Sequence, residues 1–426
     1  MCGEPYSWSM EVVVGNLVAG GDAIARLPSG KVVFVDGALP GETVDIDFTT
    51  NRKDFARARV IAVLDPADER VDPPCKFAGQ CGGCRWQHLA TPDQFMAKAR
   101  IAAESLVRIG RIELSDQMVE TSMRHGRIPA VAYRTTIRVA FDTQGRVGFR
   151  ARGSNDVVPI DSCLVAHPLI NRVLPHLSAR PGTDAEVTIR CSTTTEVVAA
   201  MVHGDENDVS GLEKFDVVGA DARIIESVHG VDLVVSMGAF FQSGPAAAAL
   251  LVDTVRHHAG PEALSGAYGQ VIDAYGGGGL FAATLVPSHV PVTLLEENSW
   301  AVNDARVNLG GHLATIRRAP VEEWQAQPAG LVIADPARTG LGRGGVDALI
   351  AAQATVFVLV SCDAAAGARD ARLLAESGYE LEAYSVLDLF PHTHHLEIVM
   401  RFRRTTPADE SRPVTRSFAS DVPPAA

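Results

Sequence analysis

The sequence predicts an α/β protein in three parts: a small N-terminal β-barrel, a central and mainly β region, and a C-terminal doubly wound sheet. Short valine-rich runs separated by turns fill Met10 to Val63, and short alternating segments fill Val131 to Val235. From Phe240, apolar strands alternate with alanine-rich helices, the pattern of a parallel sheet covered on both faces. We expect a barrel over 1–65, a central region over 66–239, a doubly wound domain over 240–404 and a disordered tail over 405–426.

Composition describes an ordinary globular chain of 426 residues with a net charge of −13. No apolar stretch approaches the roughly 18 residues of a membrane span, and no basic segment followed by an apolar one stands at the N-terminus. We expect a cytoplasmic protein without membrane contact and infer no obligate protein partner. The acidity is uneven, because Arg85 to Arg152 holds 12 Lys and Arg against 6 Asp and Glu. That segment suits either a local phosphate-binding face or a scatter of solvated charges.

The N-terminal segment has the spacing of a small oligonucleotide-binding barrel. Its turns fall at Gly20-Gly21, at Pro28 to Gly30 and at Leu39 to Gly41. Four cations stand near one strand pair and could follow a nucleic-acid backbone: Arg52, Lys53, Arg57 and Arg59. A barrel that serves only for packing is the alternative.

Three cysteines gather in a proline- and glycine-rich stretch with little helix or strand character, namely Cys75, Cys81 and Cys84. Cysteines of a cytoplasmic chain are more often ligands or nucleophiles than disulfides, so we expect a metal to hold this loop. The next cysteine, Cys163, is the expected fourth ligand. Four thiolates suit tetrahedral zinc or a cubane iron–sulfur cluster, and their spacing does not separate the two; free cysteines are the remaining alternative. Cys191 has the surroundings of a buried strand residue.

A helix is expected after the cysteine loop. Thr91 is the predicted N-cap, Pro92 the first helical residue and Gln94 the residue three positions after the cap, as in a capping box. Apolar residues then recur at helical spacing from Phe95 until Gly110 ends the helix.

The first strand of the doubly wound domain runs into a glycine-rich loop. Asp273 is followed by Ala274-Tyr275-Gly276-Gly277-Gly278-Gly279 and then by a short helical run. Glycines let a backbone turn sharply and approach a ligand closely, although a structural turn uses the same residues. The next strand ends in Glu296, which suits an acid that accepts hydrogen bonds from ribose hydroxyls, with Glu297 as the competing candidate. Loop and acid together predict an adenosine-containing cofactor.

Two further strand ends carry reactive side chains. Leu331 to Ala334 runs into Asp335, and a fourth strand ends in Leu359-Val360-Ser361-Cys362-Asp363. Parallel strands present their carboxyl ends at one edge of a sheet, so the glycine loop, Glu296, Asp335 and Cys362 are expected to converge there. A buried core thiol is the commoner explanation of such a cysteine. Its position at this edge instead favours a nucleophile for covalent catalysis on a bound base.

Five segments carry a family resemblance: Phe240-Phe241-Gln242, Asp273-Ala274-Tyr275-Gly276-Gly277-Gly278-Gly279, Asp335-Pro336-Ala337-Arg338, Ser361-Cys362-Asp363-Ala364 and Asp388-Leu389-Phe390-Pro391-His392-Thr393-His394-His395-Leu396-Glu397. Together they resemble the motifs of the S-adenosylmethionine-dependent RNA uracil-5-methyltransferases. The likeness extends from Met10 to about Phe402, and the barrel resembles the TRAM domain of that family. Each motif alone is weak, and their combination is specific.

The resemblance implies transfer of a methyl group from S-adenosylmethionine to carbon 5 of a uridine in RNA. The base would leave its stack to enter the pocket. The implied roles are methyl-donor binding by Gln242, Tyr275, Glu296 and Asp335, nucleophilic attack at carbon 6 by Cys362, and general base catalysis by Glu397.

The resemblance also bears on the metal and on the RNA. The cysteine positions match the family members that hold a [4Fe-4S] cluster, which favours iron–sulfur over zinc for Cys75, Cys81, Cys84 and Cys163. Because the reaction is redox neutral, such a cluster would shape the RNA-facing surface. Those members include enzymes of large-subunit ribosomal RNA, so ribosomal RNA is expected rather than tRNA.

Some positions depart from the family pattern. Ala337 and Ala364 replace prolines, and Asp363 replaces an asparagine. Asp363 adds a negative charge beside Cys362, which would disfavour the thiolate unless a cation or hydrogen bond offsets it. One alternative is therefore an RNA-binding or ribosome-assembly protein that kept the fold and lost catalysis. An iron–sulfur oxidoreductase is another, and methylation at a different pyrimidine position is a third.

Overall fold

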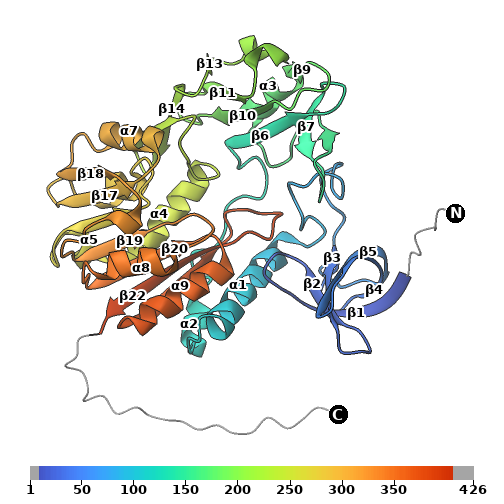
Figure 1. Ribbon diagram of the computed structural model, residues 1–426, viewed down its shortest axis with the longest axis horizontal. Coiled ribbons are helices and arrows are strands. Elements are labelled where there is room, and N and C mark those ends of the chain that lie inside the picture. The colour runs from blue at the N-terminus through green and yellow to red at the C-terminus, as the bar shows by residue number, and fades with distance from the viewer. Residues whose placement is uncertain (1–8, 406–426) are drawn as a thin grey trace, which may run out of the picture.

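The computed structural model of the protein describes residues 9–405, and Figure 1 shows its three parts: the barrel in blue, the central sheet in green and the doubly wound domain from yellow to red. The predicted fold class is confirmed. Beyond its first residue, the predicted tail lies outside the described residues. In residues 9–405, no helix has the length and apolarity to cross a membrane.

The barrel is closed by five strands in the order β1-β2-β3-β5-β4. They are β1 (Ser9–Leu17), β2 (Ala23–Arg26), β3 (Val32–Asp36), β4 (Thr43–Asn51) and β5 (Phe55–Asp65). Alternate side chains point inward, and in β3 these are Val33 and Val35, both fully buried. Gly30 and Gly41, in two of the predicted turns, have positive φ angles that glycine adopts without strain.

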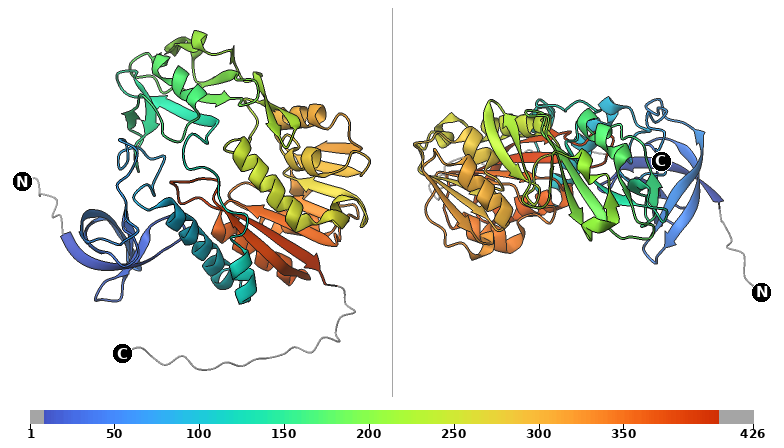
Figure 2. Two further views of the ribbon diagram at one scale, coloured as in Figure 1. Left: turned by 180° about the vertical axis from the view of Figure 1, so that it is seen from behind. Right: turned by 90° about the horizontal axis from the view of Figure 1, so that it is seen from above.

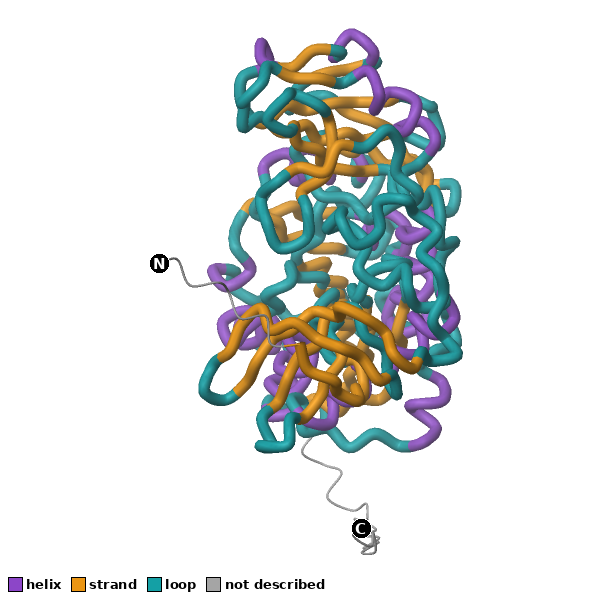
Figure 3. Tube along the Cα trace, turned by 90° about the vertical axis from the view of Figure 1, so that its right-hand side faces the viewer, coloured by secondary structure: helices purple, strands orange, loops and turns teal. Residues whose placement is uncertain are grey.

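Arg85 and Trp86, directly after the cysteine loop, dock the barrel on the rest of the protein. The Trp86 indole donates to Gly21 O at 2.9 Å. Arg85 donates to Asp22 at 2.6 Å and to Asp36 at 2.7 Å. Figure 3 shows the barrel and the central sheet as separate groups of strands. Acidic side chains of the barrel thus serve the contact between the parts.

The central part is mainly β, as predicted. Its six-stranded sheet has the order β13-β11-β10-β6-β7-β8. Its strands are β6 (Thr136–Phe141), β7 (Val147–Arg150), β8 (Val157–Pro159), β10 (Glu186–Cys191), β11 (Val198–His203) and β13 (Val217–Val218). The central part also holds the strand pair β9 (Ser178–Ala179) and β12 (Val209–Ser210), the hairpin β14 (Arg223–Val228) and β15 (Val231–Ser236), and helix α3 (Pro168–Val173). Cys191 is a buried strand residue, in agreement with the prediction.

The C-terminal sheet has seven strands in the order β18-β17-β16-β19-β20-β22-β21. They are β16 (Val271–Ala274), β17 (Val292–Glu296), β18 (Ala314–Arg318), β19 (Leu331–Ala334), β20 (Val356–Ser361), β21 (Tyr379–Leu387) and β22 (Glu397–Arg404). The first five in this order are mutually parallel. The prediction of a parallel sheet fails only at β22, which runs antiparallel to both of its neighbours.

Helices cover both faces of this sheet. One face carries α4 (Pro245–Ala259), α5 (Pro261–Leu264), α6 (Leu280–Leu285) and α7 (Ser299–Asn308). The other face carries α1 (Thr91–Arg108), α8 (Gly342–Ile350) and α9 (Ala364–Glu376). The short helix α2 (Asp116–Thr121) contacts β21. Figure 2, left, shows α4 lying across the strands. In β20, Phe357 and Leu359 face the α1 side, whereas Val358 and Val360 face the α4 side. Both faces are therefore core, which explains the continuous apolar strands.

Helix α1 begins one residue earlier than predicted. Ala90 is the N-cap and gives no side-chain hydrogen bond. The predicted capping box is wrong, because Gln94 is fully buried. Its amide donates to Trp86 O at 3.0 Å and Leu89 O at 2.7 Å. The buried carbonyls of Trp86 and Leu89 need hydrogen-bond partners, whereas the exposed start of the helix can bond to water. Gln94 therefore bonds to these carbonyls and does not cap the helix.

Candidate active site

A cavity of about 920 Å³ opens at the carboxyl edge of the seven-stranded sheet. It is lined by all six side chains predicted for methyl-donor binding and catalysis: Gln242, Tyr275, Glu296, Asp335, Cys362 and Glu397. Four of them follow or end the parallel strands β16, β17, β19 and β20, whose carboxyl ends share this edge. Glu397 reaches the same edge because β22 is antiparallel and begins where β20 ends, with Ile398 opposite Ser361.

The glycine loop after β16 forms one side of the cavity. Tyr275 has a φ of +57°, a conformation that costs a non-glycine residue free energy and is common at ligand sites. Its hydroxyl donates to Glu322 at 3.2 Å. A Cβ added to Gly276 would lie 2.8 Å from Leu294 Cγ, so this position must be glycine for the loop to pack against β17.

Glu296 ends β17 and contacts this loop. One carboxylate oxygen accepts from Gly277 N at 3.0 Å and the other from Asn298 N at 2.7 Å. Glu297 also lines the cavity but is exposed. Of the two candidate acids, Glu296 is therefore the one held by backbone amides.

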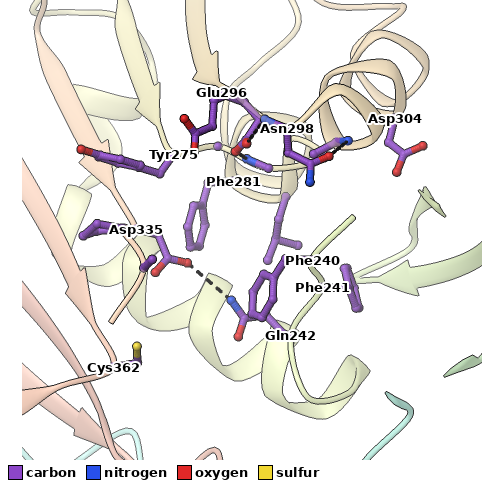
Figure 4. A pocket seen from close by; sticks show the side chains of 18 of the residues that line it. Phe240, Phe241, Gln242, Tyr275, Phe281, Glu296, Asn298, Asp304, Asp335 and Cys362 are labelled. Atoms are coloured by element: carbon purple, nitrogen blue, oxygen red, sulfur yellow. Dashed lines mark hydrogen bonds between the residues drawn. The ribbon is translucent and has the colours of Figure 1, made fainter. Parts of the chain in front are cut away.

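The opposite side of the cavity carries the sulfur of Cys362. Figure 4 shows Tyr275 and Glu296 across the cavity from Cys362, with Asp335 and Gln242 between them. The amide of Gln242 donates to Asp335 at 3.5 Å. Polar side chains thus line the space between the glycine loop and the thiol.

Burial and charge oppose ionisation of the reactive groups. Burial, followed by the carboxylates of Glu397 and Asp335, raises the pKa of Cys362 to about 12. Burial and Asp335 raise the pKa of Glu397 well above its usual range, and one of its carboxylate oxygens has no hydrogen-bond partner within residues 9–405. Arg338 opposes both shifts. A cationic ligand in the cavity would favour both anions.

The charge of Asp363 is accounted for by the helix that follows it. Its carboxylate caps α9, accepting from Ala365 N at 3.0 Å and Ala366 N at 2.8 Å. A helix N-terminus stabilises such a charge. The carboxylates that raise the pKa of the neighbouring Cys362 are instead Glu397 and Asp335.

Arg134 is a cavity residue that the sequence did not reveal. It lines both this cavity and the pocket of the cysteine loop. Its Nε donates to Tyr133 Oη at 3.3 Å, and that hydroxyl donates to Pro391 O at 3.1 Å. Within the described part of the chain, no carboxylate lies at salt-bridge distance from its guanidinium. Nothing in the sequence distinguishes it from the other basic residues of its segment.

The four predicted ligand cysteines line a second pocket, of about 270 Å³: Cys75, Cys81, Cys84 and Cys163. All four are free thiols. Burial raises the pKa of Cys84 to about 11 and also raises the pKa of Cys81 and Cys163. Among residues 9–405, no group of three His, Cys, Asp or Glu side chains is placed to hold a metal ion. The described residues therefore show a shared thiol pocket and no metal centre.

The predicted cations of the barrel are partly neutralised. Arg57 pairs with Asp22 at 2.8 Å, and Arg59 pairs with Asp47 at 2.9 Å. Arg52 and Lys53 are exposed.

Comparison with known proteins decides the family. Residues 9–61 match the TRAM domain. The 23S rRNA (uracil(1939)-C(5))-methyltransferase RlmD of Chromohalobacter salexigens is 32% identical over 95% of this chain and 91% of the relative. An uncharacterized RNA methyltransferase of Streptomyces coelicolor is 32% identical over 94% of this chain and 93% of its own length. The chain belongs to the RNA (uracil-C5-)methyltransferase family.

The methyltransferase also shares its fold with a solved structure, the Pyrococcus abyssi tRNA (uracil-54, C5)-methyltransferase in complex with S-adenosyl-L-homocysteine. The TM-score is 0.68 at 22% identity, covering 92% of this chain and 99% of that chain. At this identity the likeness concerns the fold alone. The predicted family, TRAM domain and enzyme class are confirmed.

Proposed function

We propose that this methyltransferase transfers the methyl group of S-adenosylmethionine to carbon 5 of a uridine in ribosomal RNA, through a covalent bond between Cys362 and carbon 6. The observation that carries the proposal is the single cavity that joins the glycine loop and Glu296 to Cys362 and Glu397. Ribosomal RNA is favoured because the named relative with 32% identity acts on 23S rRNA.

The donor end of the cavity suits an adenosine-containing ligand. A carboxylate has about four lone-pair sites, and Glu296 uses two for backbone amides, so two remain for ribose hydroxyls. The strained Tyr275 supplies an aromatic face, and Gln242 and Asp335 supply polar contacts between the loop and the thiol. When bound, S-adenosylmethionine supplies an electrophilic methyl group.

The catalytic end suits the activation of a uracil. Carbon 5 is a poor nucleophile until the Cys362 thiolate forms a bond with carbon 6, which places an electron pair on the ring. After carbon 5 is methylated, Glu397 takes the proton from carbon 5, the double bond between carbons 5 and 6 forms again, and the thiolate leaves. Burial and Asp335 raise the pKa of Glu397, so this step needs its ionised form, which Arg338 and a cationic ligand in the cavity favour.

We further infer that Cys75, Cys81, Cys84 and Cys163 hold a [4Fe-4S] cluster. Support for this inference comes from the one pocket that all four cysteines line, and from the match of their positions to family members that hold such a cluster. Apolar side chains, including Phe77 and Phe149, line part of the pocket beside Arg134 and would limit the access of water to the cluster.

The function is tested with anaerobically purified protein, labelled S-adenosylmethionine and two undermethylated RNA pools, ribosomal RNA and tRNA. We expect label in 5-methyluridine of ribosomal RNA with the wild type and none with Cys362→Ala. Cys191→Ala, which removes a buried thiol elsewhere, is the control and should retain activity. Label in tRNA alone would overturn the substrate, and label in another nucleoside would overturn the reaction. No label despite RNA and cofactor binding would favour a binding or assembly protein.

A further inference from the structure

The loop that joins β21 to Glu397 is held from α1 by a buried ion pair. Lys98 Nζ donates to Asp388 Oδ1 at 2.5 Å and to Phe390 O at 3.0 Å. The exposed fractions of the Lys98 and Asp388 side chains are 0% and 1%. Asp388 Oδ1 also accepts from Phe390 N at 3.2 Å, and its other carboxylate oxygen has no hydrogen-bond partner within residues 9–405, so among the described residues Lys98 is the cation that offsets this charge. One lysine therefore binds the start of the loop at two points.

A second set of contacts fixes the middle of the same loop. His392 N donates to Gln94 Oε1 at 2.7 Å, and His392 O accepts from Trp86 N at 2.9 Å. The Gln94 amide in turn donates to Trp86 O at 3.0 Å. His392 has a φ of +67°, a backbone conformation that persists in a non-glycine residue only where its surroundings hold it. The bend in the loop is thus imposed by α1 and the residues before it.

A buried ion pair is a poor means of stabilising a fold. Replacement of such a pair by apolar residues is often neutral or stabilising, whereas loss of one partner is strongly destabilising. The pair between Lys98 and Asp388 can instead specify one position for the loop. That position matters because the loop ends at Glu397, which is 3% exposed at the edge of the cavity.

We propose that Lys98 and Gln94 are positioning residues that hold the loop of residues 388–397 so that Glu397 reaches the proton on carbon 5. This inference rests on the proposed function, in which Glu397 is the base. The step it governs is breakage of the C5–H bond, with the proton passing to the Glu397 carboxylate. The electron pair of that bond forms the C5–C6 double bond, and the C6–S bond breaks to return the Cys362 thiolate. Formation of the adduct and methylation precede this step and do not need the base.

The test separates positioning from stability by removing both charges. Three variants of the full-length protein are compared. They are the single variant Lys98→Met, the double variant that combines Lys98→Met and Asp388→Asn, and the single variant Gln94→Met. Arg100→Met, an exposed position on the same helix, is the matched control. Thermal unfolding is measured first. Single-turnover reactions with labelled S-adenosylmethionine then follow label in released RNA and in a denaturation-resistant protein–RNA adduct, at a temperature where circular dichroism shows every variant folded.

We expect Lys98→Met to lose thermal stability and the double variant to regain it. Released methylated RNA should still form about 100-fold more slowly in the double variant and in Gln94→Met, because misplacing a catalytic group by about 1 Å slows its step by about 100-fold. Label should accumulate in the adduct of both variants. Arg100→Met should match the wild type. Normal product release by the double variant would overturn the positioning role, as would slow release without accumulation of the adduct.

Glu397→Gln distinguishes failure of this inference from failure of the proposed function. Accumulation of adduct in Glu397→Gln, together with normal release in the Lys98 and Gln94 variants, overturns only the positioning role. Normal release by Glu397→Gln overturns the assignment of the base itself.

Discussion

Substitution of Glu296 by glutamine tests which acid binds the ribose of the methyl donor. Glu296 accepts from Gly277 N with one oxygen and from Asn298 N with the other. Glutamine has nearly the same shape, but its amide nitrogen donates and cannot accept. Whichever way the amide turns, its NH₂ group faces a backbone N–H group.

The magnitude follows from the hydrogen bonds that change. One backbone bond, from Gly277 N or from Asn298 N, and one acceptor site for a ribose hydroxyl are lost in Glu296→Gln. The ribose bond acts directly on affinity, and a hydrogen bond to a charged acceptor contributes about 1.5–3 kcal/mol, which corresponds to roughly 10- to 150-fold in the dissociation constant. Loss of the backbone bond can only weaken binding further, because the amide of Gly277 or of Asn298 is then left without its acceptor.

The assay is calorimetric titration of S-adenosyl-L-homocysteine into the wild type and two variants. Glu297→Gln is the matched control, since Glu297 is the adjacent, exposed acid of the same cavity. We expect weaker binding for Glu296→Gln and wild-type affinity for Glu297→Gln. Wild-type affinity in Glu296→Gln, or a larger loss in Glu297→Gln, would refute the reasoning.

Three further predictions concern the thiol, the RNA and the donor site. Burial and two carboxylates raise the pKa of Cys362 to about 12, so below this pH the thiolate fraction grows about tenfold per pH unit. The single-turnover rate should therefore rise between about pH 6 and pH 9, and a flat profile would contradict this. Arg134→Gln should reduce the slope of log affinity for RNA against log salt concentration by about 0.7, the value for one phosphate contact on a single strand. Arg138 pairs with Glu186, so the control variant Arg138→Gln should leave the slope unchanged. Gly345→Ala places a Cβ 2.9 Å from the Tyr275 hydroxyl, so it should weaken S-adenosyl-L-homocysteine binding without lowering the melting temperature, and unaltered binding would show that the ring is free to move.

The sequence predicted those features that depend on local pattern. The period of two in Val33 and Val35, the glycines after Asp273 and the apolar strand before Cys362 each reflect a neighbourhood of a few residues. Parallel topology then brought the strand ends to one edge, so the lining of the cavity followed from the predicted fold.

The features that the sequence did not predict depend on distant partners. Lys98 has the sequence context of a solvated helix residue and is buried only because Asp388 lies opposite, 290 residues away in the chain. Gln94 serves a loop near the C-terminus in the same way. The direction of β22 was not inferred either, because no strand was predicted over β21, from which the short connection allows only an antiparallel return. Arg134 differs from its basic neighbours by lining both the cavity and the cysteine pocket, and no local pattern encodes that.

The antiparallel course of β22 has a geometric consequence for the reaction. Cys362 follows the end of β20, and Glu397 begins the strand hydrogen-bonded beside it. Neighbouring strands lie about 4.8 Å apart, so the pairing of β20 with β22 brings Cys362 and Glu397 close together, and in the proposed positioning the contacts of Lys98 and Gln94 with the loop complete the placement of Glu397. The two groups are assigned to adjacent atoms of one pyrimidine ring. One sheet edge therefore presents both proposed reagents to neighbouring ring carbons, and both come from a single domain.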